Sequence, residues 1–295
     1  MTQPPANLKR GIDPDSPPRP PWLKVKTPTH GRAVELAELV ERERLYTVCE
    51  SAACPNRGEC WSRGTATFMI LGNICTRSCG FCNVQVGRPT ELDLEEPVRV
   101  ARAVKRMGLG YAVVTSVNRD ELADGGASVW AATIREIRAA APGCRIEVLI
   151  PDFCGNEAAQ ETVFNERPDV LNHNVETVPR LYIPVRPQAD YRQSLELISR
   201  AKAAGLATKS GLMLGLGEEI NEVRQVMRDL RDAGCDILTL GQYLQPGPKF
   251  LRVERFVHPD EFTALAAEGA AMGFLKVESG PLVRSSYHAE EVAST

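Results

Sequence analysis

Residues 66–83 read Ala66-Thr-Phe-Met-Ile-Leu71, then Gly-Asn-Ile, then Cys75-Thr-Arg-Ser-Cys79-Gly-Phe-Cys82-Asn. The first six residues form a short apolar run that predicts a buried β-strand. Three cysteines, here called the second triplet, follow this strand with the spacing C-x3-C-x2-C. Three thiolates can bind three irons of a cubane cluster and leave the fourth iron without a protein ligand. The stretch therefore predicts an open iron–sulfur site just past the end of a strand.

Similar apolar runs recur along the chain, with amphipathic helical patterns between them. The predicted strands cover residues 66–71, 110–115, 145–150, 170–174, 207–214 and 236–240. The predicted helices cover residues 98–107, 129–140, 191–204, 219–233 and 260–272. Glycines suited to end these helices are Gly108, Gly143, Gly205, Gly234 and Gly273.

This alternation is typical of parallel strands joined by crossover helices. Six units are too few for the usual eightfold barrel. We therefore predict an α/β fold with a partial (β/α)6 barrel, although a doubly wound sheet fits the pattern nearly as well. In either fold the chemistry takes place at the C-terminal ends of the strands.

The composition excludes several classes of protein. The chain has 295 residues, is 43% hydrophobic and has a formal net charge of −3, so it can build a large core and gives no electrostatic reason to expect nucleic acid. No apolar run approaches the ~20 residues that span a bilayer, and the N-terminus has no secretory signal. Asp13 and Asp15 argue against an organelle transit peptide. We expect a cytoplasmic protein with neither a nucleic-acid nor a membrane partner.

The N-terminal residues contain a second group of three cysteines. Residues 1 to about 30 are rich in proline and are expected to run extended, with Trp22 and Leu23 as an anchor. After a predicted helix over residues 32–45 come Cys49, Cys54 and Cys60, here called the first triplet. We divide the chain into an N-terminal extension (1–64), the barrel (65–273) and a C-terminal extension (274–295).

Iron–sulfur ligation explains the two triplets better than disulfides or structural zinc. Nine cysteines cannot all pair with one another. Structural zinc takes four ligands, typically from cysteine pairs and histidines, but each group here has three cysteines and every histidine lies outside them. Cys144, Cys154 and Cys235 stand alone, and we expect them to be buried packing residues.

Several motifs carry a resemblance to known families. The second triplet, with Phe81 before its last cysteine, resembles the signature of the radical S-adenosylmethionine (radical SAM) superfamily. Residues 48–61, Val-Cys-Glu-Ser-Ala-Ala-Cys-Pro-Asn-Arg-Gly-Glu-Cys-Trp, resemble the auxiliary-cluster motif of the lipoyl synthase family. Residues 284–289, Arg-Ser-Ser-Tyr-His-Ala, resemble its C-terminal motif. Further similar blocks are residues 21–24, 115–120, 124–126, 172–177 and 241–246; residues 181–187 fit more loosely, and we assign no role to Ile183 or Pro184.

The resemblance implies a lipoyl synthase. Two sulfur atoms would be inserted at C6 and C8 of an octanoyl chain that is amide-linked to a lysine, with two [4Fe-4S] clusters and two SAM molecules per product. One cluster would cleave SAM to a 5′-deoxyadenosyl radical that abstracts hydrogen, and the auxiliary cluster would donate the sulfur and be consumed. The implied partners are an octanoylated lipoyl carrier domain, a reducing electron donor such as ferredoxin or flavodoxin, and an iron–sulfur cluster carrier.

The resemblance also assigns cluster ligands. Cys75, Cys79 and Cys82 would hold the SAM-binding cluster, and the first triplet would hold the auxiliary cluster. Ser285, in preference to Ser286, would be the fourth ligand of the auxiliary cluster. An alkoxide is a harder, more weakly matched ligand for iron than a thiolate, so it suits a cluster that must release sulfur.

Strand-end polar residues are candidates for binding SAM. Glu176 suits the ribose diol, and a lysine or arginine suits the methionine carboxylate. Ordinary packing and strand-end hydrogen bonding are the alternative roles. We expect His173 to be buried and hydrogen-bonded, and the glycines of residues 211–217 to allow close backbone approach or packing. The SAM candidates are Phe81, Ser116, Asn118, Arg119, Asn174, Glu176, Lys209, Gln242, Tyr243 and Leu244.

Two other functions stay open from the sequence. The chain could be another radical SAM enzyme whose auxiliary cluster is not consumed, or a non-catalytic scaffold that holds zinc or clusters. The preferred carrier, the electron donor, the way the cluster is rebuilt and the oligomeric state cannot be read from the residues.

Overall fold

The computed structural model describes residues 18–24, 32–51, 54, 56–63, 65–287 and 289. Most of the proline-rich N-terminal segment, and His288 of the C-terminal motif, lie outside the described residues. The short helix η1 (Pro21–Leu23) buries Leu23 and brings the ring of Trp22 to 5.1 Å from that of His258, centroid to centroid. The predicted anchor is therefore confirmed.

An eight-stranded sheet forms the body of the molecule, in the order β1-β2-β5-β6-β7-β8-β9-β10. Its strands are β1 (Tyr46–Thr47), β2 (Thr65–Ile70), β5 (Tyr111–Ser116), β6 (Arg145–Leu149), β7 (Val170–Asn172), β8 (Thr208–Leu214), β9 (Ile237–Gln242) and β10 (Lys276–Gly280). β1 pairs antiparallel with β2, and the pairs from β2 to β10 are parallel. Two short strands, β3 (Ile74–Cys75) and β4 (Gln85–Val86), pair separately.

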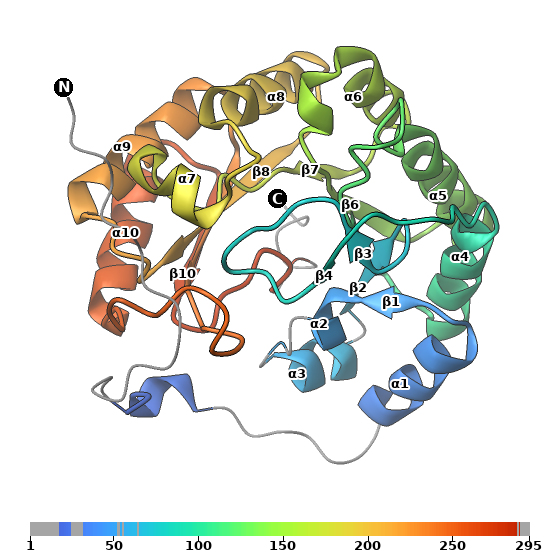
Figure 1. Cartoon of the computed structure of the whole chain (residues 1–295), viewed down its shortest axis with the longest axis horizontal. Helices are drawn as coiled ribbons and strands as arrows, with labels where there is room; N and C mark the ends of the chain where they lie inside the picture. Colours follow the sequence, from blue (N-terminus) through green and yellow to red (C-terminus); the bar gives the residue numbers. More distant parts are fainter. Residues whose placement is uncertain are drawn as a thin grey trace.

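Helices surround this curved sheet on its outer side (Figure 1). They are α4 (Glu96–Met107), α5 (Ala127–Ala140), α6 (Glu157–Phe164), α8 (Tyr191–Ala203), α9 (Ile220–Asp232) and α10 (Pro259–Ala271). A doubly wound sheet has helices on both faces and a point where strand order reverses, whereas here the strand order follows the chain. The partial barrel is confirmed and the doubly wound alternative is excluded.

The observed strands and helices have the burial patterns that the sequence predicts for them. All six residues of β2 are buried, and α9 buries Val223, Val226, Met227 and Leu230 on one side. Gly108 ends α4 with a left-handed φ of 58°. The expectation for Gly143 is wrong, because α5 ends at Ala140 and is capped by Ala141.

Several short elements escaped the pattern analysis. The helices α2 (Val48–Ser51), α3 (Arg57–Ser62) and α7 (Tyr182–Val185) are too short to show a helical period, and every residue of β10 is only half-buried. The observed helix α1 (Arg32–Arg42) ends three residues before the predicted limit. Because β10 joins the main sheet, the segment assigned to the C-terminal extension begins with a strand of that sheet; the three-part division stays a prediction.

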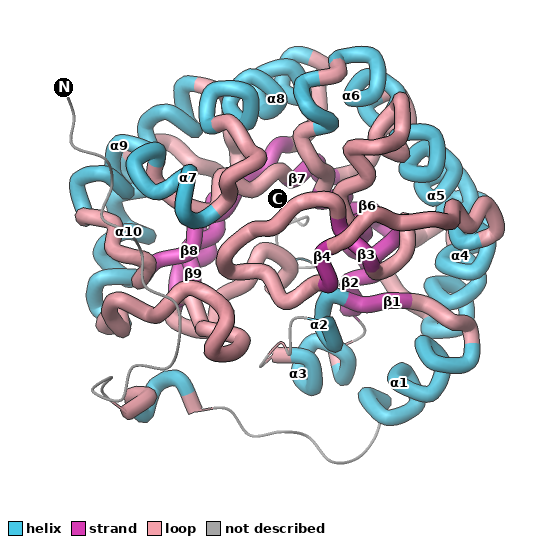
Figure 2. Tube along the Cα trace, viewed as in Figure 1, coloured by secondary structure: helices cyan, strands magenta, loops and turns pink. Residues whose placement is uncertain are grey.

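The loop between β3 and β4, residues 76–84, extends over the middle of the partial barrel (Figure 2). This loop, here called the cluster loop, contains Cys79 and Cys82. None of the described helices is long and apolar enough to cross a membrane.

Candidate active site between the two cysteine triplets

A cavity of about 640 Å³ at the C-terminal ends of the strands joins residues of both triplets. Its lining includes Cys49 and Cys54, the whole second triplet, Ser285 and Ser286. In the described part of the chain, no three metal-binding side chains converge as they would around one ion. A cubane cluster distributes its thiolates over separate irons, so wider spacing of the sulfurs suits such a cluster.

The second triplet is partly shielded from solvent, with Cys75 buried and Cys79 and Cys82 half-buried, and it has hydrogen-bond donors directed at sulfur. The Cys75 Sγ atom accepts hydrogen bonds from the backbone N–H of Arg77 at 3.4 Å and of Asn118 at 3.3 Å. Burial raises the pKa of the Cys79 thiol to about 12 and that of Cys82 to about 11. Thiolates in such a place need a cation, which a metal site supplies, and N–H donors to sulfur are a feature of iron–sulfur ligation. The three thiols of the second triplet and the N–H donors beside them therefore fit an iron–sulfur cluster.

The first triplet lies on short helices and meets the C-terminal segment. A smaller, separate cavity is lined by all three of its cysteines together with Thr67, Arg284, Ser286 and Tyr287. Thr67 Oγ1 donates to Ser286 Oγ at 2.9 Å, and Asn56 Nδ2 donates to the Leu282 carbonyl at 2.6 Å. Burial, and then the neighbouring Cys54, raises the pKa of the Cys49 thiol. Both serines therefore lie near the triplet: Ser286 lines both cavities, and Ser285 lines the larger one.

Most of the predicted SAM contacts line the larger cavity. They are Phe81, Ser116, Asn118, Asn174, Glu176, Gln242, Tyr243 and Leu244. Three buried oxygens there, Ser116 Oγ, Asn118 Oδ1 and Asn174 Oδ1, have no hydrogen-bond partner. Buried polar atoms are rarely left unpaired, so these oxygens fit a cavity that receives a polar ligand.

Glu176 occupies a constrained position in this cavity. Its φ is +66°, in the left-handed region that non-glycine residues seldom adopt. Its N–H donates to the Gly211 carbonyl at 3.0 Å, and its own carbonyl accepts from Met213 at 2.9 Å. Burial raises the pKa of its carboxyl group, while Asn174 Nδ2 donates to Oε1 at 3.1 Å. The backbone bonds hold the carboxylate in the cavity despite the strain.

Lys209 and Arg119 do not reach the cavity. Lys209 lies near the start of β8, at the opposite end from the cavity, and its Nζ donates to both oxygens of Glu147 at 3.0 Å. Tyr111 and Asn172 bind the same carboxylate. The buried Arg119 guanidinium pairs with Glu121 and donates to the carbonyls of residues 71 and 91. Both cationic side chains are therefore paired with groups outside the cavity.

Arg186, to which the sequence patterns assigned no role, supplies a cation to the cavity. The residue is buried, and its Nη1 donates to the Asn174 carbonyl at 2.8 Å, while Nε has no partner. Arg186 lies in the stretch that fits the family blocks loosely, and it immediately follows α7. In the sequence, a charged residue before a proline at 187 does not by itself indicate a ligand-binding residue. Only the fold shows that Arg186 lies at the cavity.

Two glycines permit close packing at the strand ends. A Cβ on Gly241 would lie 2.1 Å from the Val283 carbonyl oxygen, so this glycine lets the C-terminal segment cross β9. A Cβ on Gly211 would lie 2.3 Å from Thr239 Oγ1. The expected close approach at residue 211 is therefore packing against a neighbouring strand.

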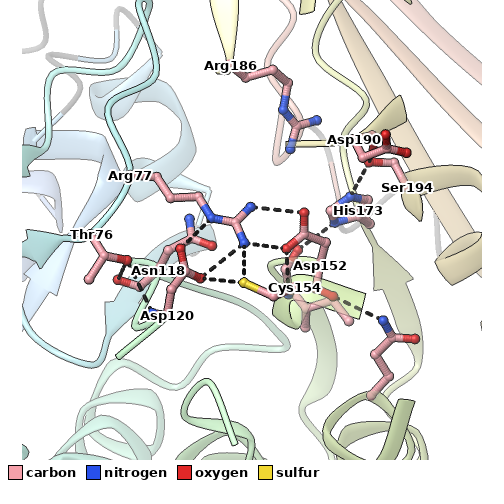
Figure 3. Close-up of polar contacts among 12 residues, drawn as sticks. Thr76, Arg77, Asn118, Asp120, Asp152, Cys154, His173, Arg186, Asp190 and Ser194 are labelled. Atoms are coloured by element: carbon pink, nitrogen blue, oxygen red, sulfur yellow. Dashed lines mark hydrogen bonds and ion pairs between the residues drawn. The ribbon is translucent and has the colours of Figure 1, made fainter. Parts of the chain in front are cut away.

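His173 is buried, as predicted, whereas Cys154 is exposed although it was predicted to be buried. His173 Nδ1 lies 2.9 Å from the Ile150 carbonyl and Nε2 lies 3.0 Å from Ser194 Oγ (Figure 3). Burial lowers the pKa of the imidazole to about 4, so the ring is neutral at pH 7. Cys144 and Cys235 are buried, but Cys154 is exposed in the short helix η2 (Phe153–Gly155), which follows β6.

Comparisons with known proteins identify the family. Residues 69–230 match the radical SAM superfamily. The chain is 61% identical over 275 residues to a lipoyl synthase of Rubrobacter xylanophilus, which covers 92% of this chain and 86% of that relative. A mitochondrial lipoyl synthase of Nematostella vectensis is 53% identical, covering 96% and 98%. The chain belongs to the lipoyl synthase family. Like other members of the radical SAM superfamily, lipoyl synthases use a [4Fe-4S] cluster and SAM, and this chain is a radical SAM enzyme.

Solved structures share the fold. Methylornithine synthase has a TM-score of 0.55 at 16% identity, covering 84% of this chain and 76% of its own. The hydrogenase maturase HydG of Carboxydothermus hydrogenoformans has a TM-score of 0.58 at 16% identity, covering 88% and 77%. The lipoyl synthase family thus shares its partial barrel with proteins of very different sequence.

Proposed function

We propose that this chain inserts two sulfur atoms, at C6 and C8, into an octanoyl chain amide-linked to a lysine of a lipoyl carrier domain. The observation that carries the proposal is the single cavity lined by residues of both triplets. A radical site and a sulfur source must both reach one substrate carbon, and a shared cavity meets that requirement.

The second triplet is proposed to hold the SAM-binding cluster and the first triplet the auxiliary cluster. When bound, the first of these groups supplies with SAM a hydrogen-abstracting radical, and the second supplies sulfur. The protein's part is to keep the thiols dry, direct N–H donors at Cys75 Sγ and exclude water from the substrate.

The strand-end residues of the cavity are proposed to bind SAM. Glu176 suits the ribose hydroxyls, and the unpaired oxygens of Ser116, Asn118 and Asn174 suit the amino group and hydroxyls. Arg186, rather than Lys209, is proposed to pair with the methionine carboxylate, because its guanidinium lines the cavity and its Nε is unpaired. Arg119 has no part in this binding.

Ser285 is proposed as the fourth ligand of the auxiliary cluster. It lines the cavity together with Cys49 and Cys54, and its hydroxyl has no hydrogen bond to Thr67, unlike that of Ser286. The lining of the cavity also includes the apolar side chains of Val48, Met69 and Val84, which suit an alkyl chain.

The remaining partners and the location are proposals as well. We propose two SAM molecules per product, an electron donor of the ferredoxin or flavodoxin type, and a cluster carrier that rebuilds the consumed cluster. A cytoplasmic location is proposed as well, although one relative that is 53% identical is mitochondrial.

Mass spectrometry tests the function directly. An octanoyl-lysine peptide is incubated anaerobically with the reconstituted full chain, SAM and reductant. The expected product gains two sulfur atoms, and inorganic sulfide is lost from the protein in step with product. SAM cleavage without a sulfur gain, or a sulfur gain from an undiminished cluster, would instead favour an enzyme whose auxiliary cluster is not consumed.

A further inference from the structure

Arg77 lies inside the cluster loop, between two cysteines of the second triplet, but its side chain is directed toward two other loops (Figure 3). Nε and Nη2 donate to Asp120 at 2.7 and 3.0 Å. Nη1 and Nη2 donate to Asp152 at 2.9 and 2.6 Å. Asp120 follows β5, and Asp152 follows β6. One guanidinium therefore ties the cluster loop to the ends of two barrel strands.

Arg77 and Asp152 form the buried part of this network, and Asp120 lies at the surface. The side chain of Arg77 is 4% exposed and that of Asp152 is 0% exposed. Burial alone would raise the pKa of the Asp152 carboxyl group, but the hydrogen bonds and charge of Arg77 hold it at about 2. Planar bidentate pairing of this kind fixes orientation as well as distance, which a lysine cannot do.

The same segment directs a backbone donor at the cluster-binding sulfur. The N–H of Arg77 donates to Cys75 Sγ, as does that of Asn118 two residues before Asp120. Thr76 Oγ1 bonds the Asn118 carbonyl at 3.1 Å and accepts from the N–H of Asp120 at 3.2 Å. Holding the guanidinium between two carboxylates thus also fixes the peptide groups that face the sulfur.

We propose that Arg77 is a positioning residue for the SAM-binding cluster, through its bonds to Asp120 and Asp152. The proposal rests on the proposed function, which assigns a cluster to the second triplet. Hydrogen bonds to cluster sulfurs raise the reduction potential of the cluster. Arg77 lines the cavity, but its guanidinium is held by Asp120 and Asp152, so it tunes the electron transfer to SAM through the position of the cluster loop.

The test uses the full chain with the first triplet replaced by alanine, so that one cluster remains. Arg77→Lys and Asp120→Asn are compared with Arg224→Lys, which alters a similar bidentate pair with Glu268 on the outer helices. Iron content, the EPR line shape and midpoint potential of the reduced cluster, and the rate of SAM cleavage are measured. Unfolding temperature is recorded for each variant.

Arg77→Lys is expected to shift the midpoint potential to more negative values and change the EPR line shape; because the cluster is then harder for the external donor to reduce, SAM cleavage should slow about 10- to 100-fold. Asp120→Asn, which keeps the Asp152 pair, should show a smaller shift of the same sign. Arg224→Lys should match the parent in all spectroscopic readouts. If Arg77→Lys or Asp120→Asn folds and binds iron with the parent's potential and line shape, the positioning role is wrong. If the parent itself binds no cluster or does not cleave SAM, the proposed function fails instead.

Discussion

The two cysteine triplets differ in how the protein holds them. The second triplet lies at the end of β3 and on the cluster loop, which Arg77 and the backbone donors to Cys75 Sγ tie to the barrel. The first triplet lies on α2, α3 and their connection, outside the barrel strands, and meets residues 282–287 of the C-terminal segment. Rigid support suits a cluster used repeatedly, and a site closed by a distant segment suits one that is dismantled. The following predictions test that difference.

The largest effect is expected from the second triplet. Cys79→Ala should abolish both SAM cleavage and sulfur insertion, because the cluster that reduces SAM loses a ligand. Anaerobic assays of methionine and of thiolated peptide measure the two activities. Cys144→Ala, which removes a buried thiol remote from the cavity lining, is the control and should retain both. Substantial SAM cleavage by Cys79→Ala would contradict the assignment.

Loss of the first triplet should separate the two activities. Cys54→Ala should leave SAM cleavage within about threefold of the parent, since the radical site is intact, and stop sulfur insertion. Iron content should fall from about eight to about four per chain, as expected for one remaining cubane cluster. Equal loss of both activities would mean that the triplets depend on each other for folding.

Variants of Ser285 and Ser286 test which of the two serines is the fourth ligand of the auxiliary cluster. Ser285→Ala should permit SAM cleavage and block sulfur insertion, whereas Ser286→Ala, which loses only the bond with Thr67, should retain most of the product. A neutral buried hydrogen bond is worth about 1 kcal/mol. The reverse result would make Ser286 the ligand. Sulfur insertion at a normal rate by both variants would exclude a serine ligand.

Replacement of Arg186 should affect only the binding of SAM. Arg186→Gln removes one of the cationic side chains that line the cavity and should weaken SAM binding about 10- to 100-fold, as expected for a lost charged hydrogen bond of about 1.5–3 kcal/mol. Equilibrium dialysis with labelled SAM measures the effect. Arg180→Gln, which breaks an exposed pair with Glu222, is the control. Unchanged SAM affinity in Arg186→Gln would reject the role.

The smallest effect is expected on the stability of the barrel at acid pH, through His173. The pKa of His173 is about 4 in the folded chain and 6.5 in the unfolded one, so the unfolded state takes up a proton first as pH falls. Stability is therefore full above pH 6.5 and falls by about 3 kcal/mol toward pH 4. Denaturant unfolding of His173→Gln and of the parent at both pH values gives the difference. Parallel pH profiles would contradict this prediction.

The local patterns of the sequence predicted most of the fold, but they did not assign every polar residue correctly. Lys209 and Glu176 both come from strand regions, yet one lies in a buried ion pair at the start of a strand and the other in the cavity. Strand position along the barrel axis depends on register between strands, which periodicity does not encode. For the same reason Arg186 and Asp152 went unassigned.

The sequence by itself determined the alternation of strands and helices, the family and the two groups of thiols, because burial periodicity and cysteine spacing are local properties of the chain; the strand order of the structure then decided for the partial barrel over the doubly wound sheet. The tertiary structure alone decided that both groups open into one cavity and that residues 282–287 lie beside the first triplet. It also decided that Arg77 is bound to Asp120 and Asp152. These contacts join residues tens to hundreds of positions apart, and only the packing of the strands around a common centre brings them together.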